Sequence, residues 1–284
     1  MKRVVTISDI HIDHRENRSW LEQLCHEDHG DEILILAGDL ASNVQGVKWA
    51  LEQVSNAYSQ VFFVPGNHDL WVRQDEGLNS LQRFTELLDL CSSLGVVTRQ
   101  LMISDSEGRD GLRIVPLFSW YAEEGEGDES LFLPKKGEDN TLAMWADRVR
   151  IRWPEFDSNP ASYFLGLNRI NAHSQAEVPV ISFSHFLPRQ DLIFSSKAER
   201  DRFGDQGGDR VPSFNFSRVA GSAGIERQVR HLGSTIHVHG HQHRNRDRVI
   251  DGVRYVSHCL GYPQERLSEG GATVEVRPFE IFRF

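Results

Sequence analysis

The sequence of 284 residues has few cysteines, no CxxC pair and no long apolar run. Its three cysteines, Cys25, Cys91 and Cys259, are far apart, so the chain offers no disulfide framework and suits a reducing compartment. No apolar stretch approaches the ~18 residues that a membrane span needs. A strand pattern begins by about Arg3, which leaves no room for a signal peptide. These absences predict a soluble cytoplasmic protein that does not bind membranes.

Basic residues are also in short supply. The chain has 41 acidic and 31 basic side chains and a formal net charge of −10. Binding to a nucleic-acid polymer is driven by neutralising phosphates and needs a basic surface. The charge therefore argues against such a partner but leaves small phosphorylated molecules open. Nothing in the sequence determines the oligomeric state.

What the sequence does contain, in its first third, is an alternation of strand-like and helix-like segments. The apolar, strand-like runs and the helical patterns interleave, at residues 3–8, 18–27, 32–37, 44–58, 61–64 and 78–94. This order predicts an α/β fold with parallel strands and covering helices. Further strands are expected at 96–101, 112–118, 178–184, 235–239, 253–258, 272–277 and 280–284, with a helix at 217–232.

The pattern is interrupted twice, and we interpret both interruptions as parts of a single domain that spans residues 1–284. The stretch from about 120 to 177 loses the alternation and carries predicted helices near 141–151 and 161–173. We expect it to be an insertion that lies over the functional site. The charged, glycine-rich stretch at about 189–216 is predicted to be a mobile loop.

Five of the strand-like runs end in residues that bind metals or phosphate. They are VVTISDIH, EILILAGD, QVFFVPGNHD, VPVISFSH and STIHVHGHQH. Each motif is weak by itself, since Gly-Asp and Pro-Gly-Asn are common turn sequences. In open α/β sheets, however, ligands bind at the carboxyl ends of the strands. The five ends together predict one composite metal site.

These strand ends supply oxygen and imidazole ligands. They are Asp9, His11, Asp39, Asn67, His185, His241 and His243. This set is too large for one tetrahedral ion and suits two ions that share a bridging carboxylate such as Asp39. Imidazole and carboxylate ligands without thiolate favour Mn, Fe or Zn. Two ions about 3.5–4 Å apart generate a hydroxide nucleophile near neutral pH and clamp the oxygens of an in-line displacement.

His68 follows Asn67 directly, and we expect it to point away from the ligands toward substrate. It is the candidate general acid for the leaving oxygen. Asp69, the next residue, is expected to fix the tautomer of His68 and hold it protonated. His68 and Asp69 are therefore the predicted catalytic pair.

The ordered motifs, from Asp9 to His243, resemble the calcineurin-like metallophosphoesterase superfamily over nearly the whole chain. The resemblance implies a fold of two mixed β-sheets packed as a sandwich and flanked by helices. It implies that Asp39 bridges two ions, one held with Asp9, His11 and His243 and the other with Asn67, His185 and His241. It also implies hydrolysis of a small phosphoester by a bridging hydroxide.

Differences within the superfamily narrow this expectation. Protein Ser/Thr phosphatases carry a longer GDxVDRG motif, where this chain reads Gly-Asp-Leu-Ala-Ser at 38–42, and lipid-A precursor pyrophosphatases carry Arg in place of His68. The chain resembles phosphodiesterases and broad phosphoesterases. One alternative is a nucleotide pyrophosphatase or nuclease of the same fold. An alternative of another class is a metal-bound protein-interaction module without turnover, against which the presence of His68 argues.

The residues that would select the substrate are less marked. Trp71 and Arg73 follow the GNHD motif, Trp120 and Tyr121 end a strand, and Arg189 follows His185 closely. Arginine can bind phosphate through two hydrogen bonds, and aromatic rings can stack on a base or sugar. The ordinary alternative is that the aromatic residues belong to the core and that the arginines are solvated.

Overall fold

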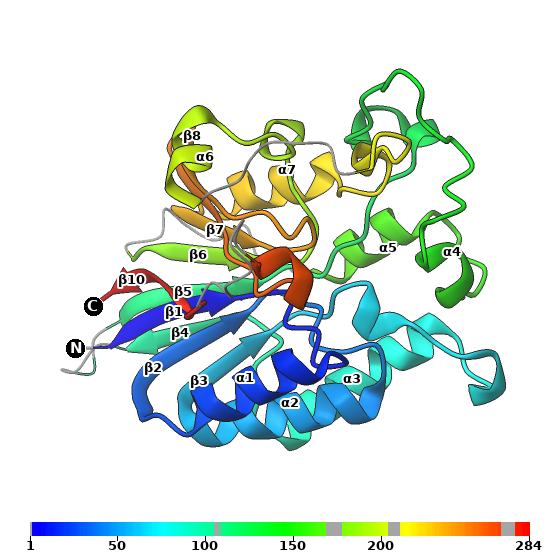
Figure 1. Ribbon diagram of the computed structural model, residues 1–284. Helices are drawn as coiled ribbons and strands as arrows, with labels where there is room; N and C mark the ends of the chain where they lie inside the picture. Colours follow the sequence, from blue (N-terminus) through cyan, green and yellow to red (C-terminus); the bar gives the residue numbers. More distant parts are fainter. Residues whose placement is uncertain (1, 105–107, 109, 169–177, 204–210, 268–275) are drawn as a thin grey trace.

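In the computed structural model, two β-sheets pack face to face and helices cover their outer faces (Figure 1). The structure describes the chain except for residues 1, 105–107, 109, 169–177, 204–210 and 268–275. None of the helices in these described parts combines the length and the apolar character needed to cross a bilayer. The predicted fold class, two mixed sheets with flanking helices, is confirmed.

The first sheet has four strands in the order β10-β1-β2-β3. They are β1 (Arg3–Ile7), β2 (His29–Leu36), β3 (Tyr58–Phe63) and β10 (Phe279–Arg283). β1, β2 and β3 are parallel, and β10 joins β1 in the antiparallel sense. The connecting helices α1 (Arg15–Cys25), α2 (Val44–Ala57) and α3 (Ser80–Ser93) cover the outer face of this sheet (Figure 1).

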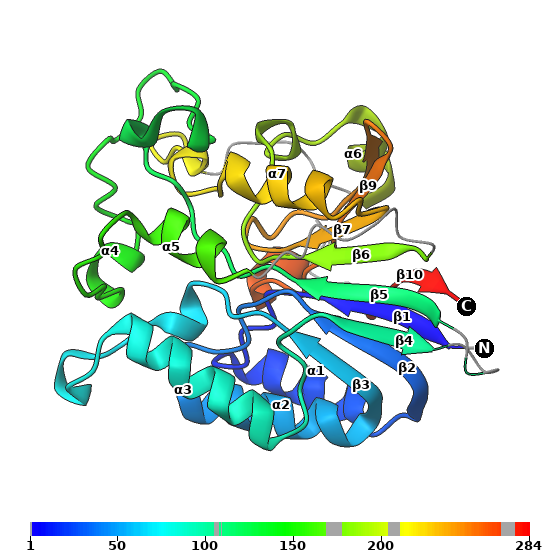
Figure 2. The ribbon, with the colours of Figure 1, turned by 180° about the vertical axis from the view of Figure 1, so that it is seen from behind.

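The second sheet has six strands in the order β4-β5-β6-β7-β9-β8. They are β4 (Leu101–Ser104), β5 (Asp110–Pro116), β6 (Val180–Phe183), β7 (Ile236–His239), β8 (Arg246–Ile250) and β9 (Val253–Ser257). The four inner strands are parallel, and the two edge strands are antiparallel to their neighbours. Helix α7 (Ala223–His231) packs on its outer face, as the view from behind shows (Figure 2).

Several of the helices begin at polar residues whose side chains cap them. Asn43, Asn79, Asn159 and Ser222 each accept a hydrogen bond from a backbone N–H in the first turn of α2, α3, α5 (Pro160–Leu167) and α7. Such caps satisfy N–H groups that the helix itself leaves unpaired. Short local sequence signals therefore mark where these helices begin.

The strands of the first sheet are apolar without interruption because both of their faces are buried. In β2, Ile33 and Ile35 point into the core between the sheets, whereas Leu34 and Leu36 point toward the helices. Successive strand residues face opposite sides, so an unbroken apolar run serves two cores. Across the inner core, Phe62 of β3 meets Phe183 of β6 edge to face, with ring centroids 6.5 Å apart.

Several sequence expectations are corrected. The strand β8 was not predicted, and the helix expected near 141–151 is reduced to α4 (Asp147–Arg150). The stretch 189–216, predicted to be a loop, contains α6 (Lys197–Phe203), which is held to the edge strand by an ion pair between Glu199 and Arg248. The strand expected at 272–277 lies largely outside the described residues. The prediction of a single domain stays a prediction, which the shared inner core supports.

Candidate metal centre

The parallel strands of both sheets point toward the side of the molecule where α4 and α5 lie (Figures 1 and 2). At that side, Ser8 after β1 pairs with Cys259 after β9, so the two sheets meet there. The predicted ligands follow the ends of β1, β2, β3, β6 and β7. The structure therefore brings together side chains that are up to 234 residues apart in the sequence, from Asp9 to His243.

The backbone at these strand ends is unusual. Five of the predicted ligands have left-handed φ angles: Asp9 at 52°, His11 at 46°, Asp39 at 58°, His241 at 74° and His243 at 53°. This conformation is uncommon for residues other than glycine and is found where the surroundings enforce it. Here the bend turns each side chain from the strand direction toward the gap between the two sheets.

The glycines in the motifs make room for this convergence. A Cβ atom on Gly38 would lie 2.4 Å from Nδ1 of His185, and one on Gly66 would lie 2.2 Å from Oδ1 of Asp39. Real Cβ atoms do not approach other atoms so closely. The Gly-Asp and Gly-Asn pairs of the sequence are therefore requirements of packing around the ligands.

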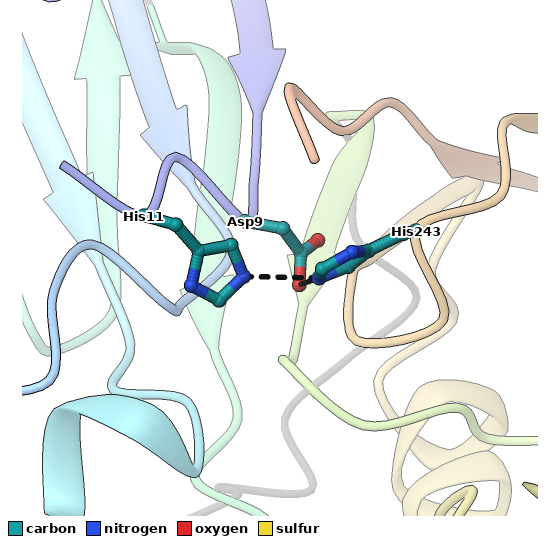
Figure 3. Close-up of side chains that lie close together, drawn as sticks. All are labelled: Asp9, His11 and His243. Carbon is teal, nitrogen blue, oxygen red and sulfur yellow. Dashed lines mark hydrogen bonds and ion pairs between the residues drawn. The ribbon is translucent and has the colours of Figure 1, made fainter. Parts of the chain in front are cut away.

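The first group of ligands consists of Asp9, His11 and His243, which point toward one another (Figure 3). The Nε2 atoms of His11 and His243 lie 2.9 Å apart, and Nε2 of His243 lies 3.5 Å from Oδ1 of Asp9. On its other side, Nδ1 of His243 is 2.7 Å from Oε2 of Glu265. A carboxylate in this position fixes the orientation of the imidazole and leaves Nε2 directed at the centre.

The second group consists of Asp39, His185 and His241, with Asn67 beside them. Nε2 of His185 lies 3.1 Å from Oδ1 of Asn67 and 3.2 Å from Nδ1 of His241. The remaining ring nitrogens face backbone carbonyl groups, of Ala37 at 2.8 Å from His185 and of Val219 at 2.9 Å from His241. In each of these two rings, one nitrogen is held by a backbone carbonyl and the other faces the centre, where an ion could bind.

Asp39 lies between the two groups. Its Oδ2 is 3.9 Å from Nε2 of His11 and 3.5 Å from Nε2 of His185. Together with the geometry of the two groups, this position fits the sequence expectation of a carboxylate shared by two ions. That the seven residues hold metal stays a prediction.

The charges at the centre fit a cation. Although burial tends to raise the pKa of Asp9, its hydrogen bond with His243 and the surrounding histidines hold that pKa far below its usual value. Burial tends to lower the pKa of His243, but its hydrogen bonds with Asp9 and Glu265 raise it to about 10. Burial and the carboxylates Asp69 and Asp9 raise the pKa of Asp39. Burial lowers the pKa of His11, His185 and His241 and so favours the neutral form of these rings, which is the form that binds metal.

His68 lies beside the centre and is more accessible than Asn67 before it or Asp69 after it. Its ring stacks on Trp71, with centroids 3.7 Å apart, and meets the edge of the His11 ring at 4.7 Å. Burial and the neighbouring histidines His243 and His185 lower its pKa to about 3. In the protein alone, His68 is therefore neutral near pH 7.

The structure corrects the predicted pairing of Asp69 with His68. The Asp69 carboxylate accepts hydrogen bonds from four backbone N–H groups, those of Asp39, Leu40, Ala41 and Gly66, at 2.8, 2.8, 3.2 and 2.8 Å. His68 and Asp69 follow each other in a short 3₁₀ turn (His68–Leu70), so their side chains point in different directions. Asp69 joins the end of β2 to the end of β3 and does not position His68.

The predicted substrate residues divide into two sets. Trp71 and Tyr121 lie near the centre: Trp71 packs on His68, and Tyr121 contacts Trp145, whose ring meets His241. Trp120 is buried among the rings of Trp153, Phe164 and Phe186, because it completes the core.

The two predicted arginines have carboxylate partners in the structure. Arg73 is exposed and forms an ion pair with Asp75. Arg189 forms ion pairs with Asp191 and Glu226, at 2.9 and 3.0 Å. A phosphate would have to displace these partners, and the assignment of both arginines to substrate stays a prediction.

Three residues at the centre were not predicted. Glu265 supports His243, and the ring of Tyr262 packs against those of His11 and His243 with centroids 4.7 Å from each. Asp147, at the start of α4, contacts Asn67, and burial raises its pKa to about 6. None of the three follows a strand in a recognisable motif, so the sequence contains no local signal that would reveal them.

Comparison with known proteins agrees with this centre. A family model described as calcineurin-like phosphoesterase matches residues 2–245. The acyl-carrier-protein phosphodiesterase PptH of Mycobacterium tuberculosis is 27% identical in an alignment 277 residues long, which covers 91% of this chain and 78% of that protein. The crystal structure of the phosphopantetheinyl hydrolase PptH from the same organism superposes with a TM-score of 0.66 at 24% identity. That superposition covers 93% of this chain and 91% of the other, and it shows a shared fold.

The first prediction concerns Asp69. In Asp69→Asn, an amide NH₂ replaces one carboxylate oxygen, so two of the four backbone N–H groups face a donor. We expect the free energy of unfolding to fall by about 1–3 kcal/mol, the cost of leaving buried donors unpaired, and phosphoesterase activity to fall with it. Denaturant unfolding and kcat/KM measure the two effects. Asp75→Asn, an exposed change of the same kind, is the control, and equal effects from both variants would contradict the role given to Asp69.

Proposed function

This chain belongs to the calcineurin-like phosphoesterase family and is a metal-dependent phosphoester hydrolase, and we propose that it cleaves phosphodiesters with two ions held by the metal centre. The observation that carries the two-ion proposal is the position of Asp39 between the two ligand groups. Nitrogen and oxygen ligands without thiolate support Mn, Fe or Zn in both positions. This assignment as a hydrolase replaces the alternative considered from the sequence, a metal-bound protein-interaction module without turnover.

The chain's own residues prepare the reaction by holding their groups in place before substrate arrives. When bound, the two ions supply a nucleophilic water and offset the charge of the phosphate. His185 and His241 are held by backbone carbonyl groups and His243 by Glu265, so their binding nitrogens need no reorientation. Asp69 holds the Asp39 loop against the Asn67 turn and so sets the spacing between the two groups.

His68 acts on the leaving oxygen in this proposal. Its ring is fixed between Trp71 and His11, and it is partly accessible, whereas Asp9, Asp39 and the neighbouring Asn67 are buried. Its low pKa in the protein alone disfavours the protonated form. A bound phosphate places negative charge beside it, which raises the pKa of His68 toward the range that a general acid needs. Substrate binding, rather than Asp69, then provides the protonated histidine.

We propose a phosphodiester carried by an acyl-carrier protein as the first physiological candidate. The support is the relative named acyl-carrier-protein phosphodiesterase, which matches this chain over 91% of its length. The segment that holds α4 also exposes Arg150 and Arg152, and neither forms an ion pair with any of the described residues. Their backbone carbonyls bond to Val72 and Ser80, which places them close to the His68 turn. Unpaired arginines there suit an anionic partner.

A cytoplasmic location is also part of the proposal. Cys25, Cys91 and Cys259 are all free in the structure, and burial raises the pKa of each thiol. Sparse, unpaired and unreactive thiols are usual in a reducing compartment.

The test of the proposed function is a substrate profile of purified, Mn-loaded protein. We expect kcat/KM to be higher for an aryl phosphodiester than for the matching aryl monoester, and we expect release of phosphopantetheine from an acyl-carrier protein that bears it. Cyclic nucleotides and dinucleotide polyphosphates complete the panel. A preference for monoesters would overturn the diester proposal, and faster turnover of dinucleotide polyphosphates would favour the pyrophosphatase alternative.

A second measurement tests the metal centre itself. Elemental analysis should find close to two transition-metal ions per chain, and a strong chelator should abolish activity that Mn²⁺ then restores. Because Asp39 faces both groups, Asp39→Ala should lose both ions, whereas a change at one end, such as His243→Ala, should retain more metal. One tightly held ion with full activity would refute the bridged centre.

The role of His68 has its own signature. His68→Ala should lower kcat by about 10²–10⁴-fold, the range for loss of a positioned acid, while the metal content stays near that of the wild type. The loss should be larger for substrates with poor leaving groups than for aryl esters, whose leaving oxygen needs little protonation. If the variant loses metal instead, His68 is a ligand, a role that its proximity to His11 and Asp39 also permits.

A further inference from the structure

Asp147 is a buried carboxylate from the 120–177 segment that points into the metal centre. Only 2% of the residue is exposed. Its Oδ1 accepts hydrogen bonds from Nδ2 of Asn67 at 2.9 Å and from the indole Nε1 of Trp71 at 2.6 Å. Among the described residues no lysine or arginine forms an ion pair with it. Burying a carboxylate against neutral donors is costly, so its position calls for an explanation.

The first consequence concerns the amide of Asn67. An asparagine amide has an accepting oxygen on one side and a donating NH₂ on the other, and the partners decide which side faces where. Asp147 accepts only, so it attracts the NH₂ group. The oxygen is then turned toward Nε2 of His185, 3.1 Å away. Only this orientation presents an oxygen ligand to an ion.

The second consequence concerns His68. The Trp71 indole that donates to Asp147 also stacks on the His68 ring, with centroids 3.7 Å apart. Asp147 therefore fixes the surface against which the proposed acid rests. One oxygen atom of one side chain holds both a proposed ligand and the support of a proposed catalytic residue.

The other neighbours of the Asp147 carboxylate, Tyr121 and Trp145, belong to its own segment. It lies in the first turn of α4, but no side chain caps this helix. The end of α4 and the residues after it are anchored independently, by hydrogen bonds from Val72 N–H to the Arg150 carbonyl at 2.9 Å and from Ser80 N–H to the Arg152 carbonyl at 2.8 Å. The segment would thus stay attached to the 72–80 loop without the Asp147 side chain.

We propose that Asp147 is a positioning residue for the reaction, which turns the oxygen of Asn67 toward the metal centre and holds Trp71 against His68. The 120–177 segment is then part of the catalytic apparatus and not only a cover over it. The part of the inference that concerns Asn67 rests on the proposed two-ion function, in which Asn67 is a ligand. The geometry of Trp71 and Asp147 can be tested without any metal.

The test compares Asp147→Leu with Asp157→Leu, which makes the same change at an exposed residue of the same segment. Both hydrogen bonds end on Oδ1 of Asp147, and an asparagine could keep an oxygen there. Leucine has nearly the same shape but no acceptor, so the Asn67 amide is free to turn. We expect the affinity of chelator-treated protein for Mn²⁺, measured by calorimetry, to fall about 10–100-fold, the usual effect of removing such a supporting group. Asp157→Leu should match the wild type.

Two further readouts separate positioning from general damage. Activity of Asp147→Leu on an aryl diester should fall mainly in kcat, and higher Mn²⁺ concentrations should restore part of it. In the metal-free protein, the indole N–H signal of Trp71 in a ¹⁵N–¹H spectrum should shift in Asp147→Leu and stay in place in Asp157→Leu. Trp71→Phe identifies that signal by its disappearance.

Trp71→Phe also serves if Asp147→Leu yields too little folded protein. Phenylalanine keeps a ring under His68 but removes the donor to Asp147, so we expect kcat to fall while Mn²⁺ affinity stays within about twofold of wild type, since the Asn67 contact is retained. The inference is overturned if Asp147→Leu has wild-type Mn²⁺ affinity and kcat. It is overturned equally if the variant shows an unshifted Trp71 signal, or if Trp71→Phe leaves kcat unchanged. Wild-type protein that binds Mn²⁺ but hydrolyses no phosphoester would instead refute the proposed function.

Discussion

The metal centre depends on one buried carboxylate that binds no metal in our assignment. Asp69 accepts four backbone N–H groups from two loops, one after β2 and one after β3. The loops carry Asp39 and Asn67, which must approach each other from adjacent parallel strands. Backbone N–H groups at strand ends have lost their sheet partners and need an acceptor when they are buried. A single carboxylate meets this need and fixes the distance between the loops.

Joining the two loops crowds the predicted ligands together at the centre. Carboxylates and imidazoles are buried side by side with left-handed backbones at five positions, an arrangement that is costly in both conformation and desolvation. The raised pKa values of Asp39 and His243 express the same conflict: Asp39 is buried beside other carboxylates, and His243, although buried, bonds to Asp9 and Glu265. Cations would relieve it, because they neutralise the acids and use the free nitrogens of the rings. The rigid sandwich of two sheets holds the side chains in this costly arrangement.

The 120–177 segment changes how the site is understood. The sequence predicts an insertion that lies over the site. The structure instead connects it to the ligands: Asp147 contacts Asn67, and Trp145 lies against His241. Residues 123–138 are also packed, with Leu131 buried and Glu138 paired to Arg218. Variation in this segment would therefore alter both the surface that meets a substrate and the groups that support the metal centre.

The sequence by itself determined the α/β class, most helices and the strand-end residues that the structure brings together as predicted ligands. Each of these depends on local signals: helix caps, unbroken apolar runs, and glycines directly before Asp39, Asn67 and His241. Such signals act within a few residues along the chain, so a reader of the sequence can find them. Strand β8 and the short α4 lacked a clear pattern and were missed or misjudged.

Only the tertiary structure decided which side chains face one another. Asp69 was assigned to His68 because they are neighbours in sequence, but a 3₁₀ turn sends their side chains apart. Trp120 could have been surface or core, and its burial among other rings made it core. Glu265 and Asp147 reach the centre from segments without any motif, 22 and 80 residues from their partners His243 and Asn67. Hydrogen bonds act over about 3 Å in space, and no spacing along the chain encodes which distant groups the fold brings within that range.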